Sequence, residues 1–205
     1  MVSQNYRFLF GPLAGAILSF GVAGLALAIP DYSHVHQTVS EIGEIGSPAR
    51  VPFGIMLFCV AVCILVFASA VRDVSLAAHH SAFAAYLIGF MALPAAGIGV
   101  FAYPHPLHNF FGISELIGYQ APLALALTWR GDRRAKTLVA VSWIFFALIW
   151  GAIVLNLTFL VPSVWAYVKP IHGLAQRALF ATWFGWCAVV GILLFQGKWH
   201  ASRGF

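Results

Sequence analysis

The sequence predicts an all-α integral membrane protein, a bundle of six transmembrane helices. Of its 205 residues, 61% are hydrophobic and only 8% are charged, whereas soluble domains carry about a quarter charged residues. The mean hydropathy of +0.90 leaves too few polar side chains for a water-facing surface. Apolar segments run along the whole chain without a polar block large enough to fold alone, so we expect a single membrane domain over residues 1–205.

Each expected span is close to the roughly 20 apolar residues that a helix needs to cross a bilayer. The first, 8–29, is uncharged and ends ahead of Pro30. It is longer than the apolar core of a signal peptide, so we expect it to be retained. The second, 51–71, has an arginine at each end. The third, 81–103, contains Pro94, which we expect to bend the helix because proline cannot donate a backbone hydrogen bond.

The remaining spans follow from the same reasoning. The fourth, 110–129, is interrupted near its start by Glu115, and the fifth, 137–162, is followed by an aromatic belt that begins at Trp165. The sixth covers residues 173–196. Because lipid offers no hydrogen-bond partner, each backbone polar group must be satisfied within its own helix, which argues against strands.

The basic residues predict how the helices are oriented. Six spans divide the eleven lysines and arginines into eight on the side of the termini and three on the other side. Cytoplasmic loops are the ones enriched in lysine and arginine, so we expect a multi-pass protein of the cell inner membrane with both termini in the cytoplasm. The larger set is Arg7, Arg72, Arg130, Arg133, Arg134, Lys136, Lys198 and Arg203, and the smaller is Arg50, Lys169 and Arg177.

Acids and histidines show the opposite bias. On the expected outer side fall four of the six acids and five of the eight histidines: Asp31, Glu41, Glu44, Glu115, His34, His36, His105, His108 and His172. Histidines at helix ends commonly cap carbonyl groups. Glu115 and Arg177 differ, because each lies inside an apolar span where an unpaired charge is costly. Two interpretations stay open for them: they pair with each other, or they serve binding or catalysis. For Asn156 we expect an interhelical hydrogen bond.

Three short motifs stand at helix ends. They are Ser40-Glu41-x-Gly43 with Gly46-Ser47-Pro48, then Gly99-Val-Phe-Ala-Tyr-Pro104 ahead of His108, then Gly173-Leu-Ala-Gln176-Arg177. In this order, and along nearly the whole chain, they resemble the bacterial and archaeal membrane family called domain of unknown function 998. One departure is that the family's Gly-x-Phe-Pro run is stretched here. The family's activity is unassigned, so the resemblance implies an architecture and highlights residues without supplying a reaction.

The segment Val39-Ser40-Glu41-Ile-Gly43 is also similar, more weakly, to an Ile-Ser-Asp-x-Gly segment of the eukaryotic Frag/DRAM/Sfk membrane proteins. Some of those proteins act in lipid-anchor remodelling. This similarity implies a lipid-facing function by analogy alone.

Three functions remain open from the sequence. The first is a lipid- or small-ligand-binding protein or accessory subunit, with its polar site on the outer face. The second is a membrane-embedded enzyme acting on lipid headgroups or acyl bonds, with candidate catalytic residues His36, Ser40, Glu41, His108, Glu115 and Arg177. The third is a small proton-coupled transporter. The sequence shows no inverted repeat and no paired broken helices, and both absences argue against a transporter.

Cofactor and partner expectations follow from the same residues. For the enzyme, a divalent metal stays open as a cofactor, because three histidine ligands and one open position would leave a water that the metal activates. The candidate ligands are His36, His108 and His172. Haem is disfavoured, since the histidines lie mostly in loops rather than facing each other on helices. The partners expected are membrane lipids and a protein partner or second copy, and not nucleic acid.

Overall fold

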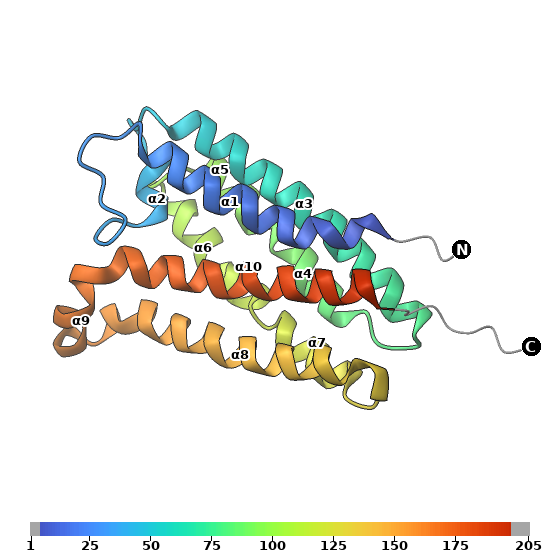
Figure 1. The fold of residues 1–205 in the computed structure, drawn as a ribbon. Coiled ribbons are helices and arrows are strands. Elements are labelled where there is room, and N and C mark those ends of the chain that lie inside the picture. The colour runs from blue at the N-terminus through green and yellow to red at the C-terminus, as the bar shows by residue number, and fades with distance from the viewer. Residues whose placement is uncertain (1–4, 198–205) are drawn as a thin grey trace, which may run out of the picture.

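The computed structural model describes residues 5–197, and these form a helical bundle (Figure 1). Six of its helical segments are long and apolar enough to span a membrane, and the described part of the chain contains no strand. The predicted all-α, six-span architecture is therefore confirmed. The segments are Tyr6–Ala26, Arg50–Ala77, Phe83–Val100, Pro106–Trp129, Arg133–Leu160 and Pro162–Gln196.

Several of these segments are built from more than one helix. The first contains η1 (Tyr6–Leu9) and α1 (Phe10–Ala26), and the second is the single helix α3 (Arg50–Ala77). The third and fourth are α4 (Phe83–Phe90) with α5 (Ala92–Val100), and α6 (Pro106–Gly118) with α7 (Ala121–Trp129). The fifth contains η2 (Arg133–Ala135), α8 (Lys136–Asn156) and η3 (Leu157–Leu160), and the sixth α9 (Pro162–Val168), η4 (Lys169–Ile171) and α10 (His172–Gln196). One short helix, α2 (Val39–Ile42), lies outside the spans.

A proline explains each of two breaks in the spans. Helix α4 ends at Phe90, four residues before Pro94, and α6 ends at Gly118, four residues before Pro122. Proline cannot donate to the carbonyl four residues earlier, and its ring crowds that carbonyl. The bend expected at Pro94 is confirmed. Pro122 adds a second break that was not expected from the sequence.

The two breaks lie against each other in the bundle. A Cβ atom on Gly118 would stand only 2.1 Å from the sulfur of Met91, the residue that separates α4 from α5. A glycine at the second break therefore allows the close approach of the third and fourth spans at this depth.

The six spans form a closed ring in which neighbours along the chain are neighbours in space. Helix α3 packs on α1, α4 and α5. Helix α5 in turn packs on α6, and α7 packs on both α4 and α8. Helix α10 closes the ring by packing on both α8 and α1. The ring is filled by large buried side chains that include Tyr119, Trp129, Trp183 and Trp186. Buried Trp186 donates its indole N–H to Ser142 Oγ at 3.0 Å, so this polar pair is satisfied within the core.

The two ends of the bundle differ in character. The beginning of η1 and the end of α10 lie at one end, and α2 and α9 lie at the other, which we call the α2 end (Figure 1). The end opposite, which we call the basic end, carries described basic residues in ion pairs, such as Arg7 with Asp73 at 2.8 Å. Lys198 and Arg203 lie outside the described residues. Which side of a membrane each end faces stays a prediction from charge.

Asp132 organises the loop that leads into the fifth span at the basic end. Its carboxylate accepts hydrogen bonds from the backbone N–H of Arg134 at 2.8 Å and from the guanidinium of Arg134 at 2.9 Å. His80 stands 3.5 Å from the same carboxylate. The hydrogen bonds from Arg134 hold the pKa of Asp132 well below its usual range.

Candidate functional site

The loop between α1 and α2 folds back over the beginning of α10, where Arg177 holds it. The Arg177 guanidinium donates to the backbone carbonyls of His34 at 2.9 Å and Gln37 at 2.8 Å, and to the hydroxyl of Tyr32 at 2.7 Å. It also donates to Nδ1 of His34 at 3.0 Å, which makes that nitrogen an acceptor. Arg177 therefore acts as a clamp between α10 and this loop.

The environment of the clamp shifts the titration of both loop side chains. Burial raises the pKa of Tyr32, although the hydrogen bond from Arg177 opposes that change. Burial, together with the positive charge of Arg177, lowers the pKa of His34. Both side chains are therefore favoured in their neutral forms at pH 7.

Gly173 lets the loop lie directly on α10. A Cβ atom at this position would stand 2.3 Å from the carbonyl oxygen of Gln37 and 2.8 Å from that of His34. Any larger residue must push the loop away from the helix. This close approach explains why a glycine stands one turn before Arg177 in the third sequence motif.

Helix α2 is fixed at its N-terminus by two sets of hydrogen bonds, and this positions Ser40. Thr38 donates its backbone N–H and its hydroxyl to the Glu41 carboxylate, at 3.2 and 2.9 Å. The side-chain carbonyl of Gln176 accepts the backbone N–H of Val39 at 2.6 Å. Glu41 is thus occupied in capping its own helix, while Ser40 faces the interior of the bundle.

Ser40 and His108 form a hydrogen-bonded pair between α2 and the first turn of α6. The Ser40 hydroxyl lies 3.0 Å from Nε2 of His108, and Nδ1 of the same ring lies 2.9 Å from the carbonyl oxygen of Phe101. A carbonyl only accepts, so Nδ1 carries the proton and Nε2 of the neutral ring is the acceptor. The serine therefore donates to the histidine, whose ring is oriented by the backbone before α6.

Glu115 and Tyr119 form a second polar pair, on the same helix line as His108. The Tyr119 hydroxyl donates to Oε2 of Glu115 at 2.7 Å. Seven residues separate Glu115 from His108, which places it about 10 Å further along the axis of the span at 1.5 Å per residue. Two turns of α6 thus carry polar groups from the α2 end into the depth of the bundle.

Both pairs line one cavity, which we call the α6–α8 cavity. It has a volume of about 420 Å³, and its walls come from α2, α5, α6, the end of α8 with η3, and α10. Exposed apolar side chains border it, among them Ile113 at 67% and Phe159 at 53% exposed, so the cavity opens on the apolar outer surface. Its polar lining residues are Ser40, His108, Asn109, Glu115, Tyr119, Asn156 and Gln176.

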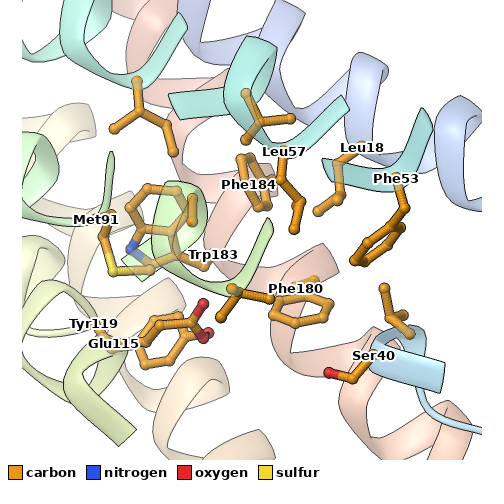
Figure 2. Close-up of a pocket in the computed structure, with 15 residues that line it drawn as sticks. Leu18, Ser40, Phe53, Leu57, Met91, Glu115, Tyr119, Phe180, Trp183 and Phe184 are labelled. Carbon is orange, nitrogen blue, oxygen red and sulfur yellow. Dashed lines mark hydrogen bonds between the residues drawn. The ribbon is translucent and has the colours of Figure 1, made fainter. Parts of the chain in front are cut away.

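A smaller inner cavity of about 50 Å³ lies behind the first. Ser40, Glu115 and Tyr119 line both, so these three residues stand in the wall between them. Figure 2 shows Ser40 and Glu115 at two edges of the inner cavity, which is otherwise surrounded by apolar side chains such as Leu57 and Phe184. The polar groups of the site are therefore set in an apolar surrounding.

A third space, a groove of about 390 Å³, runs between α1 and α10. Its polar lining residues are Ser19, His34 and Arg177, and the other lining residues are apolar. The guanidinium there is already committed to the loop, so this groove offers fewer free polar groups than the α6–α8 cavity.

The other sequence candidates do not join this site. Nδ1 of His36 lies against the carbonyl oxygen of Pro170, and the ring of His172 packs edge-on against Trp165 at 5.0 Å. Within residues 5–197 no group of three histidine, cysteine, aspartate or glutamate side chains could hold a metal ion, so His36, His108 and His172 do not form a ligand set. The expected alternative of a Glu115–Arg177 pair is wrong as well, since each has other partners.

Asn156 behaves as expected and also lies in the cavity wall. Its side-chain amide donates to the carbonyl of Ala152 in its own helix and to that of Ala175 in α10, both at 2.8 Å. Tyr119, in contrast, was not anticipated as a site residue. Its position four residues after Glu115, on the same helix face, was the signal that could have identified it.

Comparison with known proteins found no matching family model, no similar curated protein and no similar solved structure. The resemblance to the domain of unknown function 998 family therefore stays a hypothesis, and the interpretation of the site depends on its geometry.

Proposed function

We propose that this protein binds a single amphipathic molecule of the lipid class in the α6–α8 cavity. The hydrocarbon chain enters from the apolar surface, and the polar group lies at the α2 end against Ser40, His108 and Gln176. One observation carries the proposal: a cavity of about 420 Å³ combines a small set of polar side chains from α2, α6, α8 and α10 with exposed apolar side chains at its opening. Small-molecule sites typically have such a mostly apolar lining with few polar groups, and volumes of about 300–1,000 Å³.

The arrangement of polar groups matches an elongated ligand. The Gln176 side-chain carbonyl is held by Val39, so its NH2 group is left to donate toward the cavity that Gln176 lines. Glu115, about 10 Å deeper along α6, offers Oε1 beside the oxygen bound to Tyr119. A ligand with a polar end and a second polar or unsaturated group further along its chain would meet both positions.

Gly112 offers a direct test, because it lines the cavity and a Cβ atom there would have nothing within 4 Å. Gly112→Phe adds a ring to the cavity wall from a position where the new Cβ meets no neighbouring atom. Gly151→Phe is the matched control: it also has open space around its Cβ, lies mid-helix in α8, is exposed and does not line the cavity. Both changes replace a helical glycine by the same residue, so their effects on helix propensity are similar.

The measurement is native mass spectrometry, with lipid extraction, of the proteins purified in mild detergent. We expect a stoichiometric lipid-class ligand on the original protein and on Gly151→Phe, reduced at least tenfold on Gly112→Phe. Identical ligand profiles for all three proteins, at equal folded content, would contradict the proposal.

We also propose that the protein resides in the cell inner membrane with its basic end in the cytoplasm, so that the α2 end and the cavity mouth face outward. The gathering of Arg72, Arg130, Arg133, Arg134 and Lys136 toward one end supports this orientation. Reporter fusions after residue 205 test it: a fluorescent protein active only in the cytoplasm is expected to fluoresce, and a phosphatase active only outside is expected to be silent. The reverse pattern would overturn the orientation.

A further inference from the structure

We propose that Ser40 is a nucleophile and His108 its general base, and that together they transfer the acyl group of an ester whose chain lies in the α6–α8 cavity. This inference rests on the proposed function and assigns it a reaction. It starts from the hydrogen bond of 3.0 Å between the Ser40 hydroxyl and Nε2 of His108, both of which line the cavity.

The geometry matches the requirements for activating a serine. A weak nucleophile needs a base within hydrogen-bond reach, and that base needs a third group that orients it. The carbonyl of Phe101 is the third group, because it holds the Nδ1 proton of His108 at 2.9 Å and thereby turns the lone pair of Nε2 toward Ser40. His108 is only 5% exposed, so bulk water does not compete for this nitrogen.

The same residues have a simpler interpretation, in which the pair only attaches α2 to α6. Helix α2 is already held without it, by the Gln176 bond to Val39 and by the cap between Thr38 and Glu41. An anchor also has no need to stand in the wall of two cavities, as Ser40 does. The placement of the hydroxyl at the cavity surface therefore favours a chemical role.

The reaction proceeds in two balanced steps. Ser40 Oγ bonds to the carbonyl carbon of the ester while its proton moves to Nε2 of His108; the bond from that carbon to the alcohol oxygen then breaks, and the alcohol leaves with the proton. The acyl group remains as an ester on Ser40. Water or an acceptor alcohol, giving its proton to His108, attacks this ester and releases the acyl group, and the proton returns to Ser40.

Gln176 supplies a donor for the negative charge that develops on the carbonyl oxygen. Gln176 lines the cavity together with Ser40, and its side-chain carbonyl accepts from Val39, the residue that precedes Ser40. We therefore assign its NH2 group, which that bond does not use, as the donor. A side-chain amide in this position acts as other oxyanion-binding groups do. Glu115 lies too far along α6 to orient His108, and Phe101 has that task.

Fluorophosphonates test the nucleophile directly, since they release fluoride and phosphonylate an activated serine. The purified full-length protein is treated with a dodecyl and an ethyl fluorophosphonate, and the adduct is located by peptide mass spectrometry. We expect a single adduct on Ser40, faster with the dodecyl probe, and none in Ser40→Ala. His108→Gln is expected to slow labelling by about 10²- to 10⁴-fold, the usual contribution of a general base.

Ser47→Ala is the matched control, because Ser47 is a nearby hydrogen-bonded serine, between α2 and α3, that donates to Ile42 and does not line the cavity. It is expected to label as the original protein does. Absence of an adduct on Ser40 in the original protein, or equal rates in folded His108→Gln, would overturn the proposal even if Gly112→Phe still loses its bound lipid. If Ser40 is labelled but lipid retention does not depend on Gly112, the nucleophile stands and the binding function fails.

Discussion

The Arg177 clamp gives a prediction whose size can be worked out from the structure. In Arg177→Met, the loop between α1 and α2 loses four hydrogen bonds from the guanidinium, to Tyr32, to Gln37 and twice to His34. A net value of about 0.5–1.5 kcal/mol for each gives about 2–6 kcal/mol. The loop carbonyls regain water when the loop opens, so we take the lower part of this range, about 2–3 kcal/mol.

Amide hydrogen exchange measures this loss where it occurs. The backbone N–H of Gln37 is bonded to the carbonyl of Ser33 at 2.9 Å, and that of Ser33 to the side chain of Gln37 at 2.8 Å. A loss of about 2–3 kcal/mol in the opening free energy corresponds to an exchange about 30- to 150-fold faster at these amides. Arg177→Lys keeps a charge and some donors, so we expect an intermediate acceleration.

The control is Arg72→Met, which removes an exposed arginine at the basic end that pairs with Asp73 at 3.2 Å. It is expected to leave exchange of the loop unchanged, and neither variant is expected to affect amides in the middle of α3. If exchange at Ser33 and Gln37 stays within twofold of the original protein in Arg177→Met, the guanidinium does not hold the loop.

Three further predictions concern single contacts. Asn156→Leu loses the bond to Ala175 and is expected to lower the unfolding free energy by about 0.6–1 kcal/mol; no shift in detergent melting would contradict this. Ser142→Ala leaves the indole N–H of Trp186 buried without its acceptor, and we expect a loss of about 1–3 kcal/mol, which Trp186→Phe in the same chain should partly restore. The low pKa of Asp132 means that its contribution to stability is full above about pH 4 and is lost as the pH falls below that value. Asp132→Asn should therefore weaken the fall of the melting temperature at acid pH. An unchanged fall in this variant would count against the contact.

The helices could be predicted from the sequence because length and hydropathy are local properties of a segment. The bend at Pro94 was predictable for the same reason, since the lost hydrogen bond lies four residues away in the same helix. Pro122 has the same effect, but it stands inside the expected fourth span, where no break was expected. Helix α9 was also missed, because its aromatic residues are equally typical of a membrane-interface belt.

The site was only partly predictable, because its contacts join distant parts of the chain. Ser40 and His108 are 68 residues apart, and nothing in either motif indicates that the serine, rather than Glu41, is the partner of the histidine. A carboxylate beside a histidine suggests a charge pair, yet the Glu41 carboxylate is used by Thr38 in a local cap. The choice between capping and long-range contact depends on where α2 docks, which the fold decides.

Glu115 illustrates the same limit. Its position inside an apolar span indicated that it must pair or line a cavity, and it does both: it accepts from Tyr119 and lines the α6–α8 cavity. Pairing with Arg177 was one of the two interpretations that the sequence left open, because Arg177 is the other charged residue inside an expected span. In the structure the terminal guanidinium nitrogens of Arg177 instead donate to the α1–α2 loop, including the backbone carbonyls of His34 and Gln37, which the sequence pattern could not reveal.

Photo-cross-linking tests most directly the central claim that the α6–α8 cavity holds a lipid-class ligand. The protein is reconstituted with a phosphatidylethanolamine that carries a diazirine at the end of one acyl chain, illuminated, and mapped by peptide mass spectrometry. We predict cross-links at deep cavity residues such as Leu116, Ile153 and Leu179, and their loss in Gly112→Phe but not in Gly151→Phe. Cross-links confined to exposed apolar residues away from the cavity, such as Phe20 and Phe58, would contradict the proposal.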